Sequence, residues 1–273
     1  MPEILSRCRR WLGICIFFGL LGIATLVPQK AAASDTENEF EGQEILFLLE
    51  EAYTQEKGEW QIGASLNQSL EGPDERAWEL EVEYGITNRL QLFVELPFVD
   101  SVNNTGGIGD PEIGLDYALM KDTGGNIPEF TVGAAIMLPT GDNDNGPGMG
   151  GFGYQLSARI SKALASGIFV HGLAEYEAVP DARQDGADLS LREYGFGAGF
   201  AYAPIDDLYL ITEYLWAKER EKQNGFTETE VEQLLSFGVT YEFANDISIG
   251  LGGAVGLNSD SESKAFALAQ WEF

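Results

Sequence analysis

The sequence predicts an all-β protein: a transmembrane, antiparallel, up-and-down β-barrel of about twelve strands, preceded by a short N-terminal periplasmic segment. Three observations predict this fold class. The chain begins with an export signal, its residues alternate between apolar and polar from residue 58 onward, and it ends on an aromatic residue. The expected division is a cleaved signal peptide over 1–33, a periplasmic segment over 34–57 and the barrel over 58–273.

The composition excludes several other classes of protein. The 273 residues carry 16 Lys and Arg against 44 Asp and Glu, a formal net charge of −28, which would repel a nucleic acid. A hydrophobic fraction of 44% is too high for a disordered acidic chain. The 33 glycines favour turns and closely packed strands over a helical bundle. We therefore expect a packed β protein with no nucleic-acid partner.

Residues 1–33 have the three parts of a secretory signal. Arg7, Arg9 and Arg10 form a basic start, residues 11–27 are uncharged and apolar, and Ala31 and Ala33 form a small-residue cleavage site. The apolar run is short for a membrane-spanning helix, which needs about 20 residues. Cleavage would remove both cysteines of the chain, so we expect a mature protein without disulfides, held together by strand pairing and burial.

The segment that follows the signal does not alternate as the rest of the chain does. Ile45, Leu48, Leu49, Ala52 and Tyr53 have helical spacing, which predicts a short helix able to cap or plug the periplasmic mouth. A first strand with broken alternation explains the same residues equally well.

Twelve stretches after residue 58 have the period of a β-strand. Their apolar positions run over 60–66, 78–84, 90–96, 113–119, 130–138, 152–160, 168–176, 194–202, 208–216, 235–243, 247–257 and 265–273. These apolar faces carry no charge, as contact with lipid requires of the outer face of a closed barrel. A soluble β-sandwich would alternate in the same way, so other features must decide between the two.

The connections between the stretches favour the barrel because their lengths alternate. Short connections are expected around 87–89, 121–127, 162–166, 203–206 and 244–246. Longer ones, rich in Gly, Asp and Asn, are expected around 99–108, 140–150, 180–189 and 219–228. Short periplasmic turns and longer external loops are typical of bacterial outer-membrane barrels, whose even strand number leaves both termini in the periplasm.

The C-terminus adds the most specific mark. The last strand ends with Trp271 and Phe273 on its apolar face, and this arrangement resembles the signal that outer-membrane barrels present to the barrel assembly machinery. We therefore expect a Gram-negative cell outer membrane location, with outer-membrane lipid and lipopolysaccharide as surroundings.

The polar positions of the strands are the candidates for lining the lumen. They are mainly acidic: Glu79, Glu81, Glu83, Glu95, Glu112, Asp116, Arg159, His171, Glu175, Glu193, Glu213 and Glu242. Three explanations of this acidity stay open: a wet lumen that prefers cations, carboxylates that pair with Arg159 inside a narrow closed bore, or adaptation to a saline habitat.

Enzymatic chemistry has little support in the sequence. His171 is the only histidine, and Ser157 and Ser161 on the preceding strand could approach it, so a membrane-embedded hydrolase is a rival function. No nucleophile motif surrounds these serines, and a lumen histidine beside a carboxylate is the simpler interpretation. The acidic loop over 142–146 lacks the spacing of a calcium loop. We expect no enzyme activity, no cofactor and no metal site.

Two blocks resemble a known family. They run over 107–117 and 133–141, and the residues that carry the resemblance at the loop junctions are Gly109, Asp110, Pro139, Thr140 and Gly141. In these blocks the chain is similar to the outer-membrane barrel family named for the MetA pathway of phenol degradation, and the similarity extends loosely from Glu50 to Phe273. The resemblance implies a transport protein that passes aromatic or other hydrophobic small molecules.

The resulting expectation is a barrel that gives small-molecule solutes passive or facilitated passage. The alternative is a structural or surface-recognition barrel with a closed lumen, in which the loops over 140–150 and 180–189 bind a partner. A membrane-embedded hydrolase is the third hypothesis and has the least support in the sequence.

Overall fold

The computed structural model describes residues 46–71, 75–101, 106–123, 125–143, 146–165, 167–184 and 186–273, and the predicted signal peptide and residues 34–45 lie outside them. The strands are β1 (Trp60–Ser69), β2 (Glu75–Thr87), β3 (Leu90–Ser101), β4 (Gly107–Ile108), β5 (Glu112–Met120), β6 (Glu129–Met137), β7 (Gly153–Ala165), β8 (Ile168–Gln184), β9 (Ala187–Ile205), β10 (Leu208–Gln223), β11 (Phe226–Phe243), β12 (Ile247–Gly256) and β13 (Lys264–Glu272). Among the described residues, no helix is long and apolar enough to cross a membrane.

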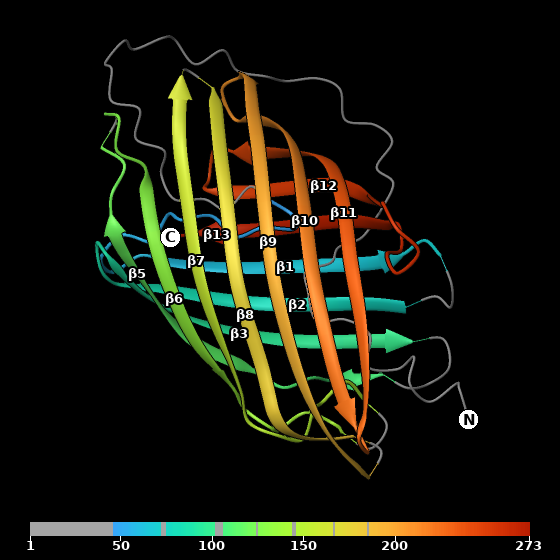
Figure 1. Ribbon diagram of the computed structural model, residues 1–273. Coiled ribbons are helices and arrows are strands. Elements are labelled where there is room, and N and C mark those ends of the chain that lie inside the picture. The colour runs from blue at the N-terminus through green and yellow to red at the C-terminus, as the bar shows by residue number, and fades with distance from the viewer. Residues whose placement is uncertain are drawn as a thin grey trace.

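The strands form one closed antiparallel barrel (Figure 1). Long strands that follow each other in sequence are hydrogen-bonded neighbours, and β1 pairs with both β2 and β13, which closes the sheet. Twelve strands make up the barrel wall, and the two-residue β4 pairs only with β3. The predicted fold class is confirmed. Closure leaves no free sheet edge, which a lipid environment demands.

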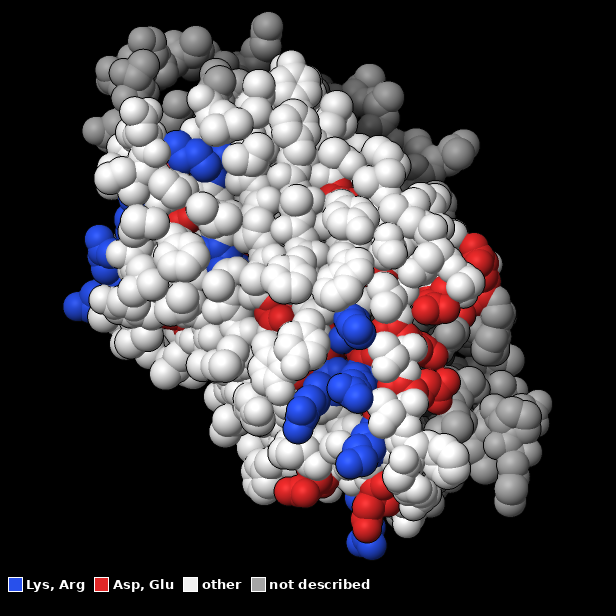
Figure 2. All heavy atoms as spheres, viewed as in Figure 1, with Lys and Arg blue, Asp and Glu red and all other residues white. Residues whose placement is uncertain are grey.

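Alternation along each strand separates an outer from an inner face. In β5 the side chains of Ile113, Leu115, Tyr117 and Leu119 are 37–49% exposed. The alternate positions Glu112 and Asp116 are buried. Figure 2 shows that uncharged residues cover most of the visible outer face. The faces expected to be apolar are therefore the outer faces, and the polar residues point inward.

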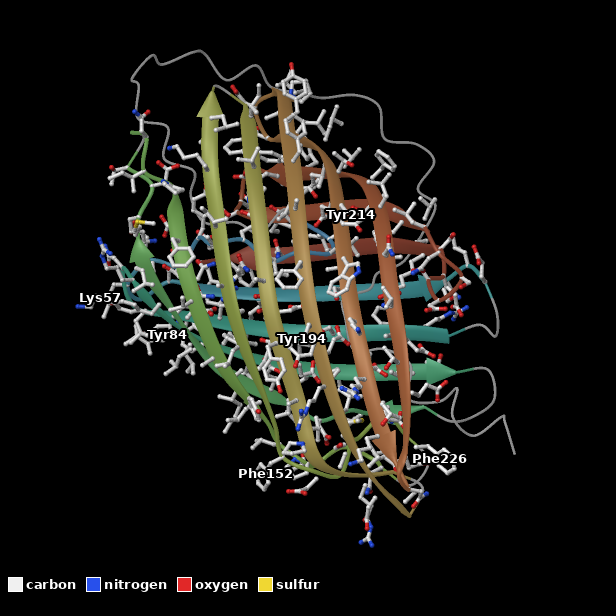
Figure 3. The ribbon with its side chains drawn as sticks, viewed as in Figure 1. Lys57, Tyr84, Phe152, Tyr194, Tyr214 and Phe226 are labelled. Atoms are coloured by element: carbon white, nitrogen blue, oxygen red, sulfur yellow. The ribbon has the colours of Figure 1, made fainter. Side chains whose placement is uncertain are left out.

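Aromatic residues gather near both ends of the outer face. Trp60 packs against Tyr84 at a ring-centroid distance of 4.5 Å, at the end of the barrel where the C-terminus lies. Toward the opposite end, Tyr176 packs against Tyr194 at 5.0 Å. Figure 3 shows Tyr84 near one end of the barrel and Tyr194 on the wall toward the other. Such belts mark the two interfaces between hydrocarbon and water.

Two of the expected long loops are strands instead. Residues 180–184 and 187–189 belong to β8 and β9, and residues 219–223 and 226–228 belong to β10 and β11. Asn224 and Gly225 both have positive φ, 51° and 84°, which is the geometry of a tight two-residue hairpin turn. A polar stretch rich in turn-forming residues can continue a strand beyond the membrane, because both faces of the sheet meet water there. β8 to β11 thus reach 16–19 residues, against 9–10 in β1, β5, β6, β12 and β13.

The first ten described residues lie inside the barrel. Leu46 to Gln55, which we call the lumen segment, are buried except for the half-buried Glu50 and Tyr53. The prediction of a short helix is wrong, and the segment does not form the alternative, a first strand, either. Further along the segment, the Ala52 and Gln55 N–H groups donate hydrogen bonds to Ser161 and Gln91 of the barrel wall, so they do not make the i to i−4 bonds of a helix. At Gly58, with φ of 93°, the chain turns out of the lumen toward β1.

Candidate functional site

The candidate site is the lumen together with the segment that occupies it. The segment is attached at its beginning by Glu213 of β10. The backbone N–H groups of Phe47, Leu48 and Leu49 donate to the Glu213 carboxylate at 2.9–3.2 Å, and the Ser236 hydroxyl donates to it at 2.9 Å. Glu213 is only 1% exposed. Several donors around one buried carboxylate are the arrangement that makes a buried negative charge tolerable.

The same part of the segment also fills an apolar side of the lumen. Phe47 stacks on Phe266 of β13 with a ring-centroid distance of 5.8 Å. Leu46 to Leu49 belong to a buried cluster with inward-facing residues of β8 to β13, including Phe169, Leu173, Ile211, Leu215, Leu234, Phe266 and Leu268. Burial of apolar side chains on this scale stabilises the inserted segment by several kcal/mol, at about 1.5–3 kcal/mol for each large side chain.

Glycines of the wall make room for these side chains. A Cβ atom on Gly197 would lie 2.0 Å from a Leu49 methyl carbon, and one on Gly238 would lie 2.2 Å from the Phe47 ring. Gly195 in the same run instead faces the side chain of Glu175. The glycine-rich stretch of β9 therefore provides space in the lumen.

The middle of the segment is held by Ser161 and Thr131. The Ala52 N–H donates to Ser161 Oγ at 2.9 Å, and the Thr131 hydroxyl donates to the Ala52 carbonyl. Ser161 Oγ also lies 2.9 Å from His171 Nδ1. His171 Nε2 has no hydrogen-bond partner among the described residues, and Glu175 faces Ser157 on the neighbouring strand. The Ser–His contact thus lacks the carboxylate that orients a catalytic histidine, and the segment covers it.

The end of the segment joins a network of amides. The Gln55 N–H donates to Gln91 Oε1 at 2.7 Å, and the Gln55 side chain donates to Gln61 and Glu83 at 3.2 Å and 3.1 Å. The Gln91 amide also donates to Glu83. These inward residues of β1, β2 and β3 thus bind the segment just before it leaves the lumen.

Arg159 links the segment to the wall. Its guanidinium forms ion pairs with Glu50 of the segment, at 2.5 Å, and with Asp116 of β5. Beside this pair is a small, partly open cavity, whose empty space is about 380 Å³ when the open solvent at its mouth is included. It is lined by ten residues: Glu50, Glu51, Tyr53, Gln61, Glu81, Glu83, Phe93, Glu95, Asp116 and Arg159. Six of the ten are acidic and one is basic. Burial, together with the carboxylates of Glu51, Asp122 and Glu129, raises the pKa of Tyr53, so its hydroxyl stays neutral and can donate a hydrogen bond.

The lumen therefore has two different sides. The expected inward residues of β2, β3 and β5 lie on the polar side around the cavity, with Arg159 of β7, while Glu213 lies among the apolar residues that hold the segment. All the residues expected to line the lumen lie on the inner face and are buried or half-buried: Glu79, Glu81, Glu83, Glu95, Glu112, Asp116, Arg159, His171, Glu175, Glu193, Glu213 and Glu242.

Sequence reasoning missed the residues that hold the segment. Gln61 and Gln91 stand at the polar positions of their strands, so the alternation places them inward, but nothing in the sequence pairs them with Gln55. The ion pair between Glu50 and Arg159 also has no signal in the sequence. The contacts of Gln55 with Gln91 and of Glu50 with Arg159 join residues 36 and 109 positions apart, and local patterns carry no signal for them.

The family-like motif organises one end of the barrel. The Asp110 carboxylate accepts hydrogen bonds from the N–H groups of Gly141 and Met149, both at 2.7 Å. A Cβ atom on Gly141 would lie 2.5 Å from the Gly109 carbonyl carbon, so the two blocks touch through their backbones. Pro139 and Thr140 lie in the same connection, before Gly141. At the opposite end, the Phe273 backbone exchanges two hydrogen bonds with Trp60, and Trp271 pairs with Ile62.

Comparison with known proteins gives a family and a fold. The family model described as "Putative MetA-pathway of phenol degradation" matches residues 47–271. The COG4313 outer membrane channel from Pseudomonas putida F1 superposes with a TM-score of 0.67 at 14% identity, over 88% of this chain and 100% of that one. The NanC porin superposes with a TM-score of 0.54 at 11% identity, over 78% and 98% of the two chains. No curated protein matches the sequence.

Proposed function

Because the chain belongs to the family of the MetA pathway of phenol degradation, whose model matches residues 47–271, we propose that it is an outer-membrane channel for small molecules. The COG4313 outer membrane channel, which has a similar fold, supports the proposal. The observation on which the proposal rests is the content of the lumen. A closed barrel contains a segment that fills its apolar side and leaves an acidic cavity on the other side.

The route for the solute runs along the acidic side of the lumen. Six carboxylates and one guanidinium line the cavity there, so the field along the route attracts cations and repels anions. Passage of anything larger than a few water molecules requires the lumen segment to move, because its side chains occupy the other half of the bore. Cations and neutral molecules, small aromatic compounds included, are the solutes that fit this lining.

Bi-ionic potentials across planar bilayers test the charge preference. We compare benzyltrimethylammonium with benzenesulfonate, two aromatic ions of similar size and opposite charge, on the refolded chain without its signal peptide. The expected result is a conductance with at least fivefold preference for the cation. A channel that conducts both ions equally would refute the acidic route, and bilayers that stay silent with both the wild type and Glu213→Gln would refute the channel itself.

The surface-recognition alternative makes a different prediction in the same experiment. A barrel with a permanently closed lumen stays silent with both ions even after the segment is loosened, for example in Glu213→Gln. The connection over 138–152, which packs on β8 and β9 through Met149 and Arg183, would then be the part to test for a bound partner.

A further inference from the structure

A group of basic side chains stands on the outer wall of the barrel. Arg192 of β9 and Lys218, Arg220 and Lys222 of β10 are all exposed, and each lies on the outward-facing side of its strand. We call these four residues the basic patch. Figure 2 shows basic side chains gathered there, below the uncharged band of the outer face. The patch holds four of the twelve Lys and Arg residues that follow residue 33, in a part of the chain with 43 acidic residues.

The strand register brings the four charges close together. Arg192 lies directly opposite Arg220, and Lys218 lies directly opposite Tyr194. Successive outward residues of one strand are about 7 Å apart, and directly opposite residues of neighbouring strands about 5 Å. All four cationic groups can therefore reach one anionic headgroup.

On the β11 side, the strand beside the patch carries no acidic residue on its outer face. The outward positions of β11 beside it are Thr227, Thr229 and Val231, whereas Glu228 and Glu230 alternate with them and face the other way. Asp188, further along β9, faces Arg183 of β8. Like charges directly opposite each other on neighbouring strands destabilise a sheet, so Arg192 and Arg220 have no structural reason to be paired. The four patch residues form no ion pair with any other described residue.

The position of the patch indicates the ligand. Lys218 lies beside Tyr194 of the aromatic belt, and the other three basic residues follow it by one or two outward positions, so the patch stands at the level of the lipid headgroups. The patch lies toward the end of the barrel opposite to the C-terminus, because Phe273 bonds to Trp60 and Glu272 bonds to Asp246 at the other end. In bacterial barrels with an even strand number both termini are periplasmic, and in that orientation the end with the patch is the extracellular end.

We propose that the basic patch is a binding site for the phosphate groups of the glycolipid of the outer leaflet, the lipid A part of lipopolysaccharide. Guanidinium groups bind phosphate through two parallel hydrogen bonds, and the two arginines supply two such forks at adjacent positions. The site lies on the outside of the wall, so it does not depend on whether the lumen conducts.

Titration of the folded chain in detergent with lipid A tests the proposal, with bound lipid counted by native mass spectrometry. The test variant is Arg192→Gln with Arg220→Gln. The control variant is Arg76→Gln with Arg183→Gln, which removes two exposed arginines toward the same end of the barrel that face acidic neighbours, Asp100 and Asp188. Wild type and control should bind bisphosphorylated lipid A at least tenfold more tightly than dephosphorylated lipid A, and the test variant should lose this preference.

Three results would overturn the proposal. The first is equal binding of phosphorylated and dephosphorylated lipid A by the wild type. The second is an equal loss of the preference for phosphorylated lipid A in the test and control variants. The third is binding of phosphatidylglycerol as tight as that of lipid A, which would show a general effect of anions. If the arginine variant does not fold, Lys218→Gln with Lys222→Gln replaces it. That pair removes the same charge from the same patch and is expected to reduce the preference at least threefold.

Discussion

At the scale of single residues, Glu213 decides whether the lumen segment stays in place. Its carboxylate accepts the N–H groups of three successive residues, and hydrogen bonds to a charged group contribute about 1.5–3 kcal/mol each. Replacement by glutamine keeps the size of the side chain but removes the charge and turns an amide N–H₂ toward the donors.

We predict that Glu213→Gln weakens the attachment of the segment by about 2 kcal/mol, which raises the population of the detached form roughly thirtyfold. Single-channel recording in planar bilayers measures this as more frequent or longer openings. Glu228→Gln, at the exposed tip of β11, makes the same charge change and should leave the recordings as in the wild type. Identical recordings for both variants would mean that the segment is not held by Glu213.

Gly238 tests the apolar half of the attachment. A methyl group there would stand 2.2 Å from the Phe47 ring, so Gly238→Ala should push Phe47 out of its pocket at a cost of about 1–3 kcal/mol. The readout is the labelling rate of a single cysteine, Leu48→Cys, by a maleimide in solution, and we expect an increase of at least fivefold.

The matched control for this variant is Gly63→Ala. Gly63 also faces inward, but its added methyl group would meet the nearest atoms at 3.6 Å, which is an ordinary contact. Faster labelling in both variants would indicate a general loosening of the barrel and would contradict a specific role of the Phe47 pocket.

At the scale of elements, Asp110 joins the junction after β4 to the connection between β6 and β7. Asp110→Asn leaves one oxygen for two N–H donors, so we predict that the connection over 138–152 detaches locally by about 1.5–3 kcal/mol. Hydrogen exchange of the Gly141 and Met149 amides measures this, and both should exchange at least tenfold faster. Unchanged exchange at these amides, or an equal change in β12, would argue against this local role.

The elements also show what the sequence could and could not predict. The period of two placed the outer faces of all twelve strands correctly, because lipid contact selects apolar residues on one side only. Strand ends beyond the membrane have no such selection, and so Asn224 and Gly225 could mark either a long loop or a two-residue turn. The helical spacing of Leu48, Leu49 and Ala52 was misleading, because their apolar side chains meet the inner wall and their amides meet Glu213 and Ser161.

At the scale of the whole molecule, stability depends on the closing seam between β1 and β13. Ala269 lies in the middle of this seam and pairs with Ala64 on one side and Ile249 on the other. Proline at this position removes an N–H that the ladder requires, and an unpaired group in hydrocarbon costs several kcal/mol.

We therefore predict that Ala269→Pro fails to form the closed barrel. Folded outer-membrane barrels resist SDS until heated, so the unheated protein should lose its faster gel band, whereas Ala269→Ser, which keeps the N–H, should retain it. Wild type should show this band with and without reducing agent, because a chain starting at residue 34 has no cysteine. A proline variant that still forms the band would mean that the seam is not essential for closure.

The unequal strand lengths give the barrel wall different heights around its entrance. At about 3.3 Å per residue and a tilt of about 40°, β8 to β11 rise some 40–48 Å, whereas a strand of nine or ten residues rises only about 23–25 Å, roughly the height of the hydrocarbon layer. β5 and β6 therefore end at a lower level than β8 to β11, and on this side the connections before β5 and after β6 form the rim of the entrance. A molecule already dissolved among the lipid headgroups could reach this rim by sideways diffusion, without first crossing open water.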